Sequence, residues 1–397
     1  MIQLLNKYSK KLSDQGLCKE GDPLLGGIDA EVLWNRVSDD IPVLLEVMDE
    51  IELNSILFAC PVEPYRSIAF YLAEKYLSEK SIKPEDSETR TFLHDIPVIS
   101  HFEGSQIAEI LKQRKSVIVL NKGIVTYGTV SPEQAFVTFS SVCFSTFVKF
   151  CTDSFFNLNK SFVLDANEEE ILFNALDYYE KRLDEKISLE HIKGPYNSQE
   201  EIYKAIADTG RLTVETGMVD SFFGNISCKV DDMIYISQTG SSLDELEDSI
   251  DPCPVDNKRT NAVTASSEFS AHKGVYLSRD ISFILHGHPK FSVIVSMLCT
   301  DLDCNNRGLC YKSCSRKRQI HEIPIIPGEV GTGPTGISST LPKALIGKGA
   351  IVFGHGLFTI GVRDFYEAFQ SLYNIEYDNF HYFKATIQNL LIKGKVI

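Results

Sequence analysis

The stretch FILHGHP, residues 283–289, is a short apolar run that ends in two histidines separated by one glycine. The run has the character of a buried strand, and side chains at positions i and i+2 of a strand point to the same face of the sheet. We therefore expect His286 and His288 to reach one metal ion together. Alone, this pair is weak evidence, because a histidine on an apolar strand is more often a hydrogen-bonded core residue.

A third metal ligand is expected from the motif GHG, residues 354–356, which follows the apolar stretch AIVF at residues 350–353. Its two glycines allow the backbone to approach a ligand closely, and His355 lies between them. Three histidines with an open fourth position are the pattern of a catalytic zinc site. Three imidazoles with a carboxylate also accept manganese, iron or cobalt, so the expected metal is zinc with other divalent ions possible.

Three polar motifs precede these histidines: GNIS at residues 224–227, QTGSS at 238–242 and SSEF at 266–269. The first motif ends the longer stretch GRLTVETGMVDSFFGNIS, and GHGLFTIG follows the histidine pair. These stretches occur in the order found in the class II aldolase/adducin family. The chain from Asn197 to the C-terminus resembles that family, which includes sugar-phosphate aldolases, epimerases, a dehydratase, decarboxylases and the non-enzymatic adducin heads. The resemblance implies an α/β fold with a mostly antiparallel central sheet flanked by helices on both faces.

Carried over position by position, the resemblance also implies roles for individual residues. Glu268 would be the acid/base carboxylate beside the metal, although a lone glutamate is also typical of a solvated surface. A substrate phosphate would be bound by small donors on turns, which more commonly satisfy their own backbone. These phosphate-binding residues would be Asn225, Thr239, Gly240, Ser266 and Ser267.

The expected function is that of a zinc-dependent aldehyde-lyase of the class II aldolase type, cleaving a phosphorylated sugar or related hydroxy-carbonyl compound through a zinc-stabilised enediolate. Epimerase or dehydratase chemistry on the same scaffold and a non-catalytic adducin-like binding module are the alternatives. Fuculose-phosphate aldolases use a tyrosine after the H-x-H strand, supplied by a neighbouring subunit. This chain has IPIIPGEVGTGPTG there, and Tyr311 lies in an insert, which puts fuculose-phosphate chemistry in doubt. The run Gly328–Gly336 is open to interpretation as a substrate loop or as a simple turn.

A self-match links the two halves of the chain. ILFACP at residues 56–61 aligns with ILHGHP at 284–289, and HDIPVIS from His94 aligns with HEIPIIP from His321. This repeat is far longer than the roughly 20–50 residues of a solenoid, so it indicates a duplicated domain. At the three histidine positions the first copy has Phe58, Cys60 and Lys122, and neither Phe nor Lys is a zinc ligand of the family type.

The self-match divides the chain into three segments. We expect a truncated, degenerate aldolase-like half-domain over residues 1–160, a helical linker over 161–196 and a complete class II aldolase/adducin-like domain over 197–397. Within the linker, residues 167–190 have helical periodicity with charge on one face. Retention of the histidines and Glu268 in the second copy alone favours an enzyme over a binding module.

The insert at residues 298–319 contains four cysteines near a basic SRKR sequence. Their C-x4-C-x5-C-x3-C spacing lacks a tight C-x-x-C knuckle, so reduced thiols, a second metal site and a regulatory disulfide are all open. The four are Cys299, Cys304, Cys310 and Cys314.

The composition of the chain limits which binding partners and which cellular location we expect. The chain has 397 residues and a formal net charge of −15, and it contains no run of about eighteen apolar residues. Residues 1–16 become polar too early for the apolar region of a secretory leader, so we expect none. We therefore expect a cytoplasmic protein that binds neither nucleic acid nor membrane. The resemblance implies a homo-oligomer, and the acidic balance is compatible with a phosphorylated small molecule as substrate.

Overall fold

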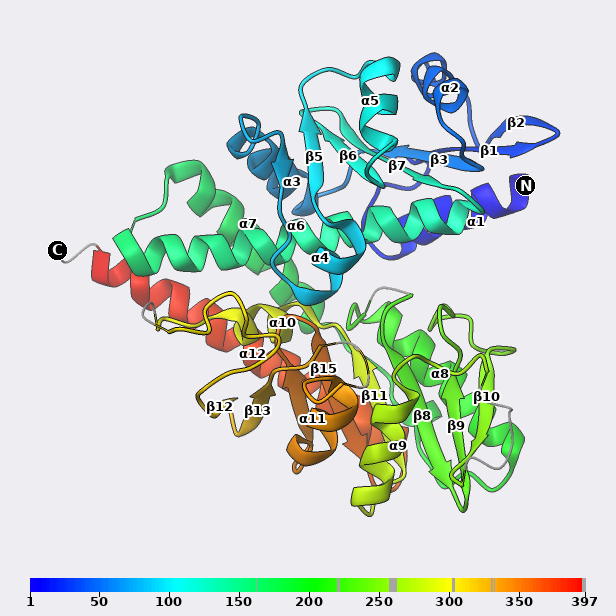
Figure 1. Cartoon of the computed structure of the whole chain (residues 1–397), viewed down its shortest axis with the longest axis vertical. Helices are drawn as coiled ribbons and strands as arrows, with labels where there is room; N and C mark the ends of the chain where they lie inside the picture. Colours follow the sequence, from blue (N-terminus) through cyan, green and yellow to red (C-terminus); the bar gives the residue numbers. More distant parts are fainter. Residues whose placement is uncertain are drawn as a thin grey trace. The chain divides into compact units, whose positions relative to one another are not determined.

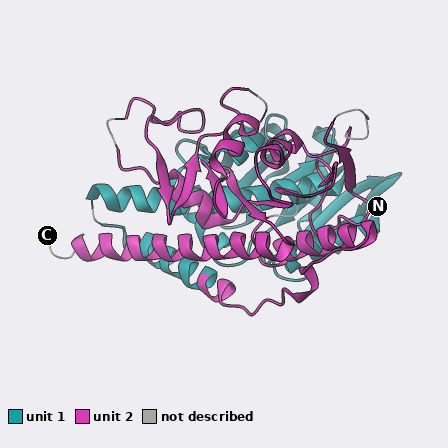
Figure 2. Cartoon of the chain, turned by 90° about the horizontal axis from the view of Figure 1, so that it is seen from below, with its two compact units in different colours: residues 1–179 teal, residues 180–397 magenta. Residues whose placement is uncertain are grey.

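The computed structural model describes residues 1–161, 163–219, 222–256, 263–301, 304–329, 331 and 333–394. The chain separates into two compact units, Met1–Tyr179 and Glu180–Ile397, shown in teal and magenta in Figure 2. The division falls within the segment 161–196 that the sequence predicts to be a helical linker.

Unit 2 is built on an eight-stranded sheet in the order β10-β9-β8-β11-β15-β14-β13-β12 (Figure 1). Among these strands β13 and β14 pair in parallel, and the other neighbours are antiparallel. This confirms the expected mostly antiparallel sheet. The strands are β8 Asn225–Val230, β9 Met233–Ser237, β10 Ile250–Pro254, β11 Phe283–Gly287, β12 Arg318–Ile320, β13 Ile323–Ile326, β14 Gly349–Val352 and β15 Gly356–Gly361.

Helices cover both faces of this sheet, and alternation along β15 shows which helix lies on which face. Phe358 packs in the core cluster with residues of α9 and α11. The next residue, Thr359, points the other way and donates its hydroxyl to Ala368 O of α12 at 2.8 Å. The helices of this unit are α8 Gln199–Glu215, α9 Phe269–Ser278, α10 Lys290–Met297, α11 Ile337–Ala344 and α12 Phe365–Gly394, with the short 3₁₀ helix η1 at Glu190–Ile192.

Unit 1 is built on a seven-stranded sheet in the order β2-β1-β3-β7-β6-β5-β4. Its strands are β1 Leu24–Asp29, β2 Glu31–Trp34, β3 Ser55–Ala59, β4 Ser81–Ile82, β5 Ile96–Ile99, β6 Ser116–Val119 and β7 Gly123–Gly128. Its helices are α1 Ile2–Asp14, α2 Ile41–Glu50, α3 Tyr65–Lys75, α4 Ser87–Leu93, α5 Gly104–Leu111 and α6 Pro132–Ser161, and α7 Ala166–Leu183 crosses the unit boundary.

The two sheets repeat the same register at the positions that the self-match aligns. Ile56 pairs with Tyr127 in unit 1 as Ile284 pairs with Ile360 in unit 2. The parallel pairs β5–β6 and β13–β14 also correspond. Thr126 of unit 1 donates to Ala135 O at 2.8 Å, which repeats the bond of Thr359 to Ala368. Residues of one unit can therefore be compared with residues of the other one by one.

Helix α6 is long and apolar enough, by length and composition, to cross a membrane, and it alone is so among the described helices. In this structure 94% of its apolar window is buried. The core helices of globular domains also have both properties. The expectation that the chain has no membrane partner stays a prediction.

Candidate metal centre

The three predicted histidines meet at one end of the unit 2 sheet. His286 lies in β11, His288 directly follows that strand, and His355 occupies the turn between β14 and β15. The Nε2 atom of His286 is 3.0 Å from Nε2 of His288 and 3.2 Å from Nε2 of His355. All three side chains are buried, and the three ligand atoms lie within 4.8 Å of one another. The sequence prediction of one shared site is therefore supported by the geometry.

Glycine at position 356 allows the two ligand-bearing segments to come this close. A Cβ atom on Gly356 would lie 2.5 Å from the carbonyl oxygen of Gly287 and 2.7 Å from Cε1 of His286. Backbone and ring atoms cannot move away at that point without opening the β11–β15 pair. Gly354, on the other side of His355, has φ +61°, which favours glycine.

The arrangement of the three ring nitrogens fits a divalent metal ion. Tetrahedral zinc with Zn–N bonds of about 2.0–2.1 Å requires ligand nitrogens about 3.3 Å apart, close to the spacings of His286. The Nδ1 atom of His286 is 3.1 Å from the Leu357 carbonyl, which accepts its proton and leaves the Nε2 lone pair for the site. Burial lowers the pKa of His288 well below its usual value, and the neighbouring His286 and His355 lower it further, so its ring is neutral.

Glu268 lies beside the same point, at the N-terminal end of α9. Its Oε1 is 3.3 Å from Nε2 of His355 and its Oε2 is 3.5 Å from Nε2 of His286. Asn225 donates its side-chain amide to Oε2 at 2.6 Å and so orients the carboxylate. Burial by itself raises the pKa of Glu268, but His286, His355 and the Asn225 amide together hold it well below its usual range. The carboxylate is therefore ionised and buried.

The expected phosphate-binding residues lie on three segments joined by backbone contacts. Asn225 opens β8, Thr239 and Gly240 follow β9, and Ser266 and Ser267 precede α9. The last two segments are linked by the bond from Thr239 N to Thr264 O at 2.8 Å and from Ser266 N to Ser237 O at 3.0 Å. Thr239, Gly240 and Ser267 are exposed, whereas Asn225 and Ser266 are buried. Their phosphate-binding role stays a prediction, and the observed contact of Asn225 is with Glu268.

Sequence inspection missed the aromatic and polar groups that pack around the histidines. The ring of Phe358 stacks on His286 with centroids 3.8 Å apart, and Phe223 stacks on His288 at 5.6 Å. His272, four residues after Glu268 in α9, is fully buried. Its Nδ1 is 2.7 Å from the Ser227 hydroxyl. That hydroxyl also lies 2.7 Å from the Tyr276 hydroxyl. The spacing of Glu268 and His272, four residues apart on a helix, is a signal that could have indicated the network.

We expect His272 to make the domain sensitive to acid. Burial lowers its pKa from 6.5 to about 3, so below pH 6.5 the unfolded chain binds a proton that the folded chain excludes. Stability should fall with pH across this window by about 1.4 kcal/mol per unit for this one group. Between pH 7 and 5 the wild type should lose about 2 kcal/mol more than His272→Gln, measured by denaturant unfolding. Equal losses in the two proteins, or the same relief in the exposed His191→Gln, would contradict this assignment.

The four clustered cysteines are free thiols, each half-buried. Burial raises the pKa of Cys310, and the nearby Cys314 raises it further. Among the described residues, only the histidine triad gathers three or more metal-ligating atoms within 4.8 Å. The structure thus gives no support to a second metal site here, and Arg316 of the basic run pairs with Asp301 at 2.7 Å.

The glycine-rich run 328–336 is closed by its own hydrogen bonds where it is described. Glu329 and Gly336 form a bridge, and the Thr335 hydroxyl donates to the Glu329 carboxylate at 2.8 Å. Val330 and Thr332 lie outside the described residues. The carbonyl of Tyr311 accepts a bond from Gly328 N at 2.9 Å, which attaches the cysteine insert to this run.

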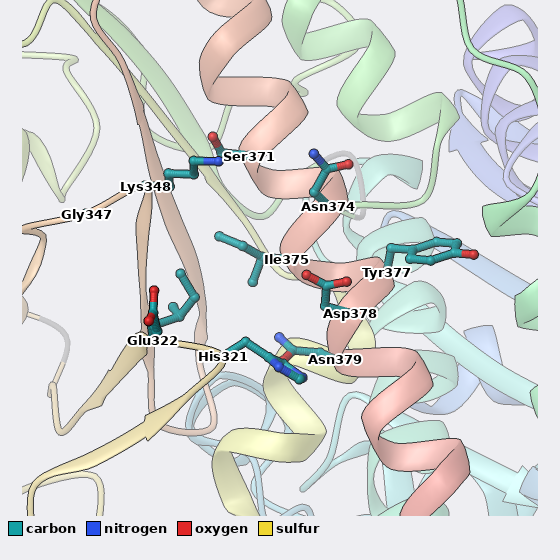
Figure 3. A pocket seen from close by; sticks show the side chains of 11 residues that line it. His321, Glu322, Gly347, Lys348, Ser371, Asn374, Ile375, Tyr377, Asp378 and Asn379 are labelled. Atoms are coloured by element: carbon teal, nitrogen blue, oxygen red, sulfur yellow. The ribbon is translucent and has the colours of Figure 1, made fainter.

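A separate pocket of about 570 Å³ lies against α12 (Figure 3). His321 and Glu322, at the turn between β12 and β13, form one wall, and Asn374 and Asp378 of α12 form another. None of the three clustered histidines lines it. The pocket is therefore distinct from the candidate metal centre.

Unit 1 has an ion pair where unit 2 has the histidine–carboxylate site. Lys122, which corresponds to His355, lies 2.9 Å from the carboxylate of Asp40. Asp40 corresponds to Glu268, because the self-match also aligns SDDI at residues 38–41 with SSEF at 266–269. The Lys122 ammonium also lies over the ring of Phe58, at 5.8 Å. Gly123 repeats the close approach of Gly356, because a Cβ there would lie 2.6 Å from Ala59 O. The backbone geometry is kept, and the metal-ligating groups are replaced.

Comparison with known proteins finds a family that residues 204–378 resemble. Residues 204–378 match the family described as Class II Aldolase and Adducin N-terminal domain, and this range includes all the candidate site residues. The match confirms the resemblance seen in the motifs. No curated protein matches the chain.

Several solved structures are similar to the chain. An L-fuculose-1-phosphate aldolase from Thermus thermophilus is 21% identical, over 49% of this chain and 96% of that one, with a TM-score of 0.37. Another L-fuculose 1-phosphate aldolase is 16% identical, over 52% and 100%, with a TM-score of 0.39. An aldolase II superfamily protein from Pseudomonas syringae is 17% identical, over 51% and 87%, with a TM-score of 0.37.

Proposed function

Because residues 204–378 form a class II aldolase/adducin domain, we propose that this chain is a metal-dependent lyase that cleaves a phosphorylated sugar or a related hydroxy-carbonyl compound. The observation that supports it most is the convergence of three buried imidazoles and one ionised carboxylate on a single point. Structural zinc sites are typically closed by four Cys or His ligands, whereas an ionised carboxylate beside three histidines is suited to proton transfer.

The proposed chemistry divides its tasks among these residues. His286, His288 and His355 would hold the metal, zinc in the first instance, which when bound acts as a Lewis acid towards substrate oxygens. Glu268 would remove and return the proton, since its carboxylate is ionised and oriented by the Asn225 amide. Phe223, stacked on His288, would cover one side of the site.

The phosphate of the substrate would lie on the exposed turn after β9 and the segment before α9. Thr239 and Ser267 offer hydroxyl donors there. Gly240 has φ +69°, and no atom lies within 4 Å of the position that a Cβ would occupy, which leaves space for a bulky anion. A phosphate bound there would lie near Glu268, because Ser267 directly precedes Glu268 in the chain.

A direct test is to incubate the zinc-loaded chain with ketose 1-phosphates and ketose 5-phosphates of both configurations and to measure aldehyde release. The same reactions in D₂O detect proton exchange at carbon by NMR. Aldehyde release that is lost on chelation and restored by zinc supports the lyase. Exchange or inversion without cleavage would favour the epimerase, and loss of water would favour the dehydratase.

The non-catalytic, adducin-like module is the remaining alternative. Unit 1 illustrates such a loss of ligands, because Phe58, Cys60 and Lys122 replace the three histidines on the same backbone. The intact donor set of unit 2 argues for catalysis. Absence of any metal after zinc loading would favour the binding module instead.

We further propose self-association of the chain, with a cytoplasmic location and no nucleic-acid or membrane partner. Sedimentation at working concentration tests the first of these. A monomer there would count against a homo-oligomer.

A further inference from the structure

The turn that carries His288 is held from the opposite side of the sheet by a buried carboxylate. Glu376 of α12 is 0% exposed. Its Oε1 accepts a hydrogen bond from Phe291 N at 2.7 Å, and its Oε2 accepts bonds from Ser292 N and from the Ser292 hydroxyl, both at 2.7 Å. These N–H groups belong to the first turn of α10, which begins two residues after His288 and has no partner for them within the helix.

A second serine of α10 holds the turn that carries His355. Ser296 lies one helical turn after Ser292, and it is likewise fully buried. Its hydroxyl accepts a hydrogen bond from Gly354 N at 2.8 Å, directly before His355. One face of α10 therefore connects both ligand-bearing turns. Asn379 of α12 completes the connection by donating to the Ser292 hydroxyl at 3.0 Å.

Comparison with unit 1 shows whether the fold requires these polar contacts. When the sequence offset of the aligned strands is extended into the following helices, Ser292, Ser296 and Glu376 correspond to Pro64, Ile68 and Cys143. None of these three can make the bonds seen in unit 2. Strand order and register form nevertheless in unit 1, so this set of buried polar contacts is not required by the architecture. Among the described residues of unit 1, which lacks the three histidines, these polar contacts do not occur.

We propose that Glu376, acting through Ser292 and Ser296, is a positioning residue for the metal centre that holds His288 and His355 at the spacing a metal requires. The proposal rests on the proposed metal-dependent function. Buried groups behind metal ligands typically change metal affinity by about 10–100-fold. The carboxylate is suited to this task because both of its oxygens accept N–H groups at a helix N-terminus, where negative charge is favoured.

The test uses the full-length chain titrated with Co²⁺ and Zn²⁺ alone, without substrate. Glu376→Gln is nearly isosteric, but it places an NH₂ group against a backbone donor. It should weaken metal binding about 10–100-fold and change the visible spectrum of bound Co²⁺. Ser292→Ala leaves the two backbone bonds to Glu376 and removes the acceptor of the Asn379 amide. It should fold with a modest loss of stability and show a smaller shift of metal affinity in the same direction.

The matched control is Ile387→Ala, a fully buried residue three turns further along α12. It should lower stability and leave the metal affinity and the Co²⁺ spectrum unchanged. Wild-type affinity and spectrum in both Glu376→Gln and Ser292→Ala would overturn the proposal, as would equal effects in Ile387→Ala. A wild-type chain that binds neither ion would overturn the metal-dependent function and this proposal together, and that outcome differs from a failure of Glu376 alone.

Discussion

His286→Ala is expected to abolish metal binding and to reduce kcat/KM by at least about 10³-fold. His286 is the central member of the triad, with its Nε2 within 3.2 Å of the Nε2 atoms of both other histidines. Its removal leaves only two imidazole ligands, His288 and His355, for the metal ion. Loss of Lewis-acid stabilisation worth several kcal/mol accounts for the expected rate effect.

Mass spectrometry of the chain purified without chelator gives the metal content of wild type and variant. About one zinc per chain in the wild type should fall to near zero in His286→Ala. The exposed His191 provides the control, because His191→Ala removes an imidazole of the same unit outside the site. Zinc that remains at full stoichiometry in His286→Ala would sink the three-histidine centre.

Glu268→Gln is expected to keep the metal and to lower kcat by about 10²–10⁴-fold, the usual contribution of a positioned acid/base group. The amide has the same shape, and its oxygen can still accept the Asn225 bond observed at 2.6 Å. It cannot take up a proton. The effect should therefore fall on the proton-transfer step and leave the three imidazoles in place.

The measurement is kcat together with metal content, on any substrate found in the screen. Glu247→Gln is the matched control, because Glu247 is an exposed carboxylate that pairs at the surface with Arg211. It should leave both quantities unchanged. If Glu268→Gln kept full kcat at full metal content, Glu268 would not be the acid/base group, and a different proton carrier would be required.

Together these two variants separate metal binding from proton transfer. Loss of both metal and rate in His286→Ala, with loss of rate alone in Glu268→Gln, is the pattern expected of a metal-dependent lyase. A binding module without catalysis would show neither rate effect. The variants thus test the function through two independent groups.

Local spacing, together with the family resemblance, predicted the three candidate metal ligands. His286 and His288 are two residues apart at the end of a strand, so the geometry of the strand itself places them on one face. His355 could be added because glycines on both sides indicated a close approach, and a Cβ on Gly356 would indeed meet His286. The self-match likewise predicted which strands correspond, because a repeated apolar pattern produces a repeated register.

The contacts behind these ligands could be known only from the tertiary structure. Asn225 was expected to bind phosphate from its motif, yet its amide donates to Glu268, 43 positions later in the chain. Glu376 lies 84 residues beyond Ser292 on a helix whose apolar pattern gave no sign of a buried carboxylate. The clustered cysteines are close in sequence and still form no closed metal site among the described residues.

The sequence by itself thus showed the resemblance of residues 204–378 to the class II aldolase/adducin family, the three clustered imidazoles and the degenerate positions of the first half. The first depends on motifs that resemble those of the family, and the other two depend on short spacing and on the self-match within the chain. The tertiary structure alone decided how Glu268 is oriented, which groups lie behind His288 and His355, and which polar side chains are buried beside them. Such contacts join distant segments, and their hydrogen bonds depend on packing distances of a few tenths of an ångström that no local pattern specifies.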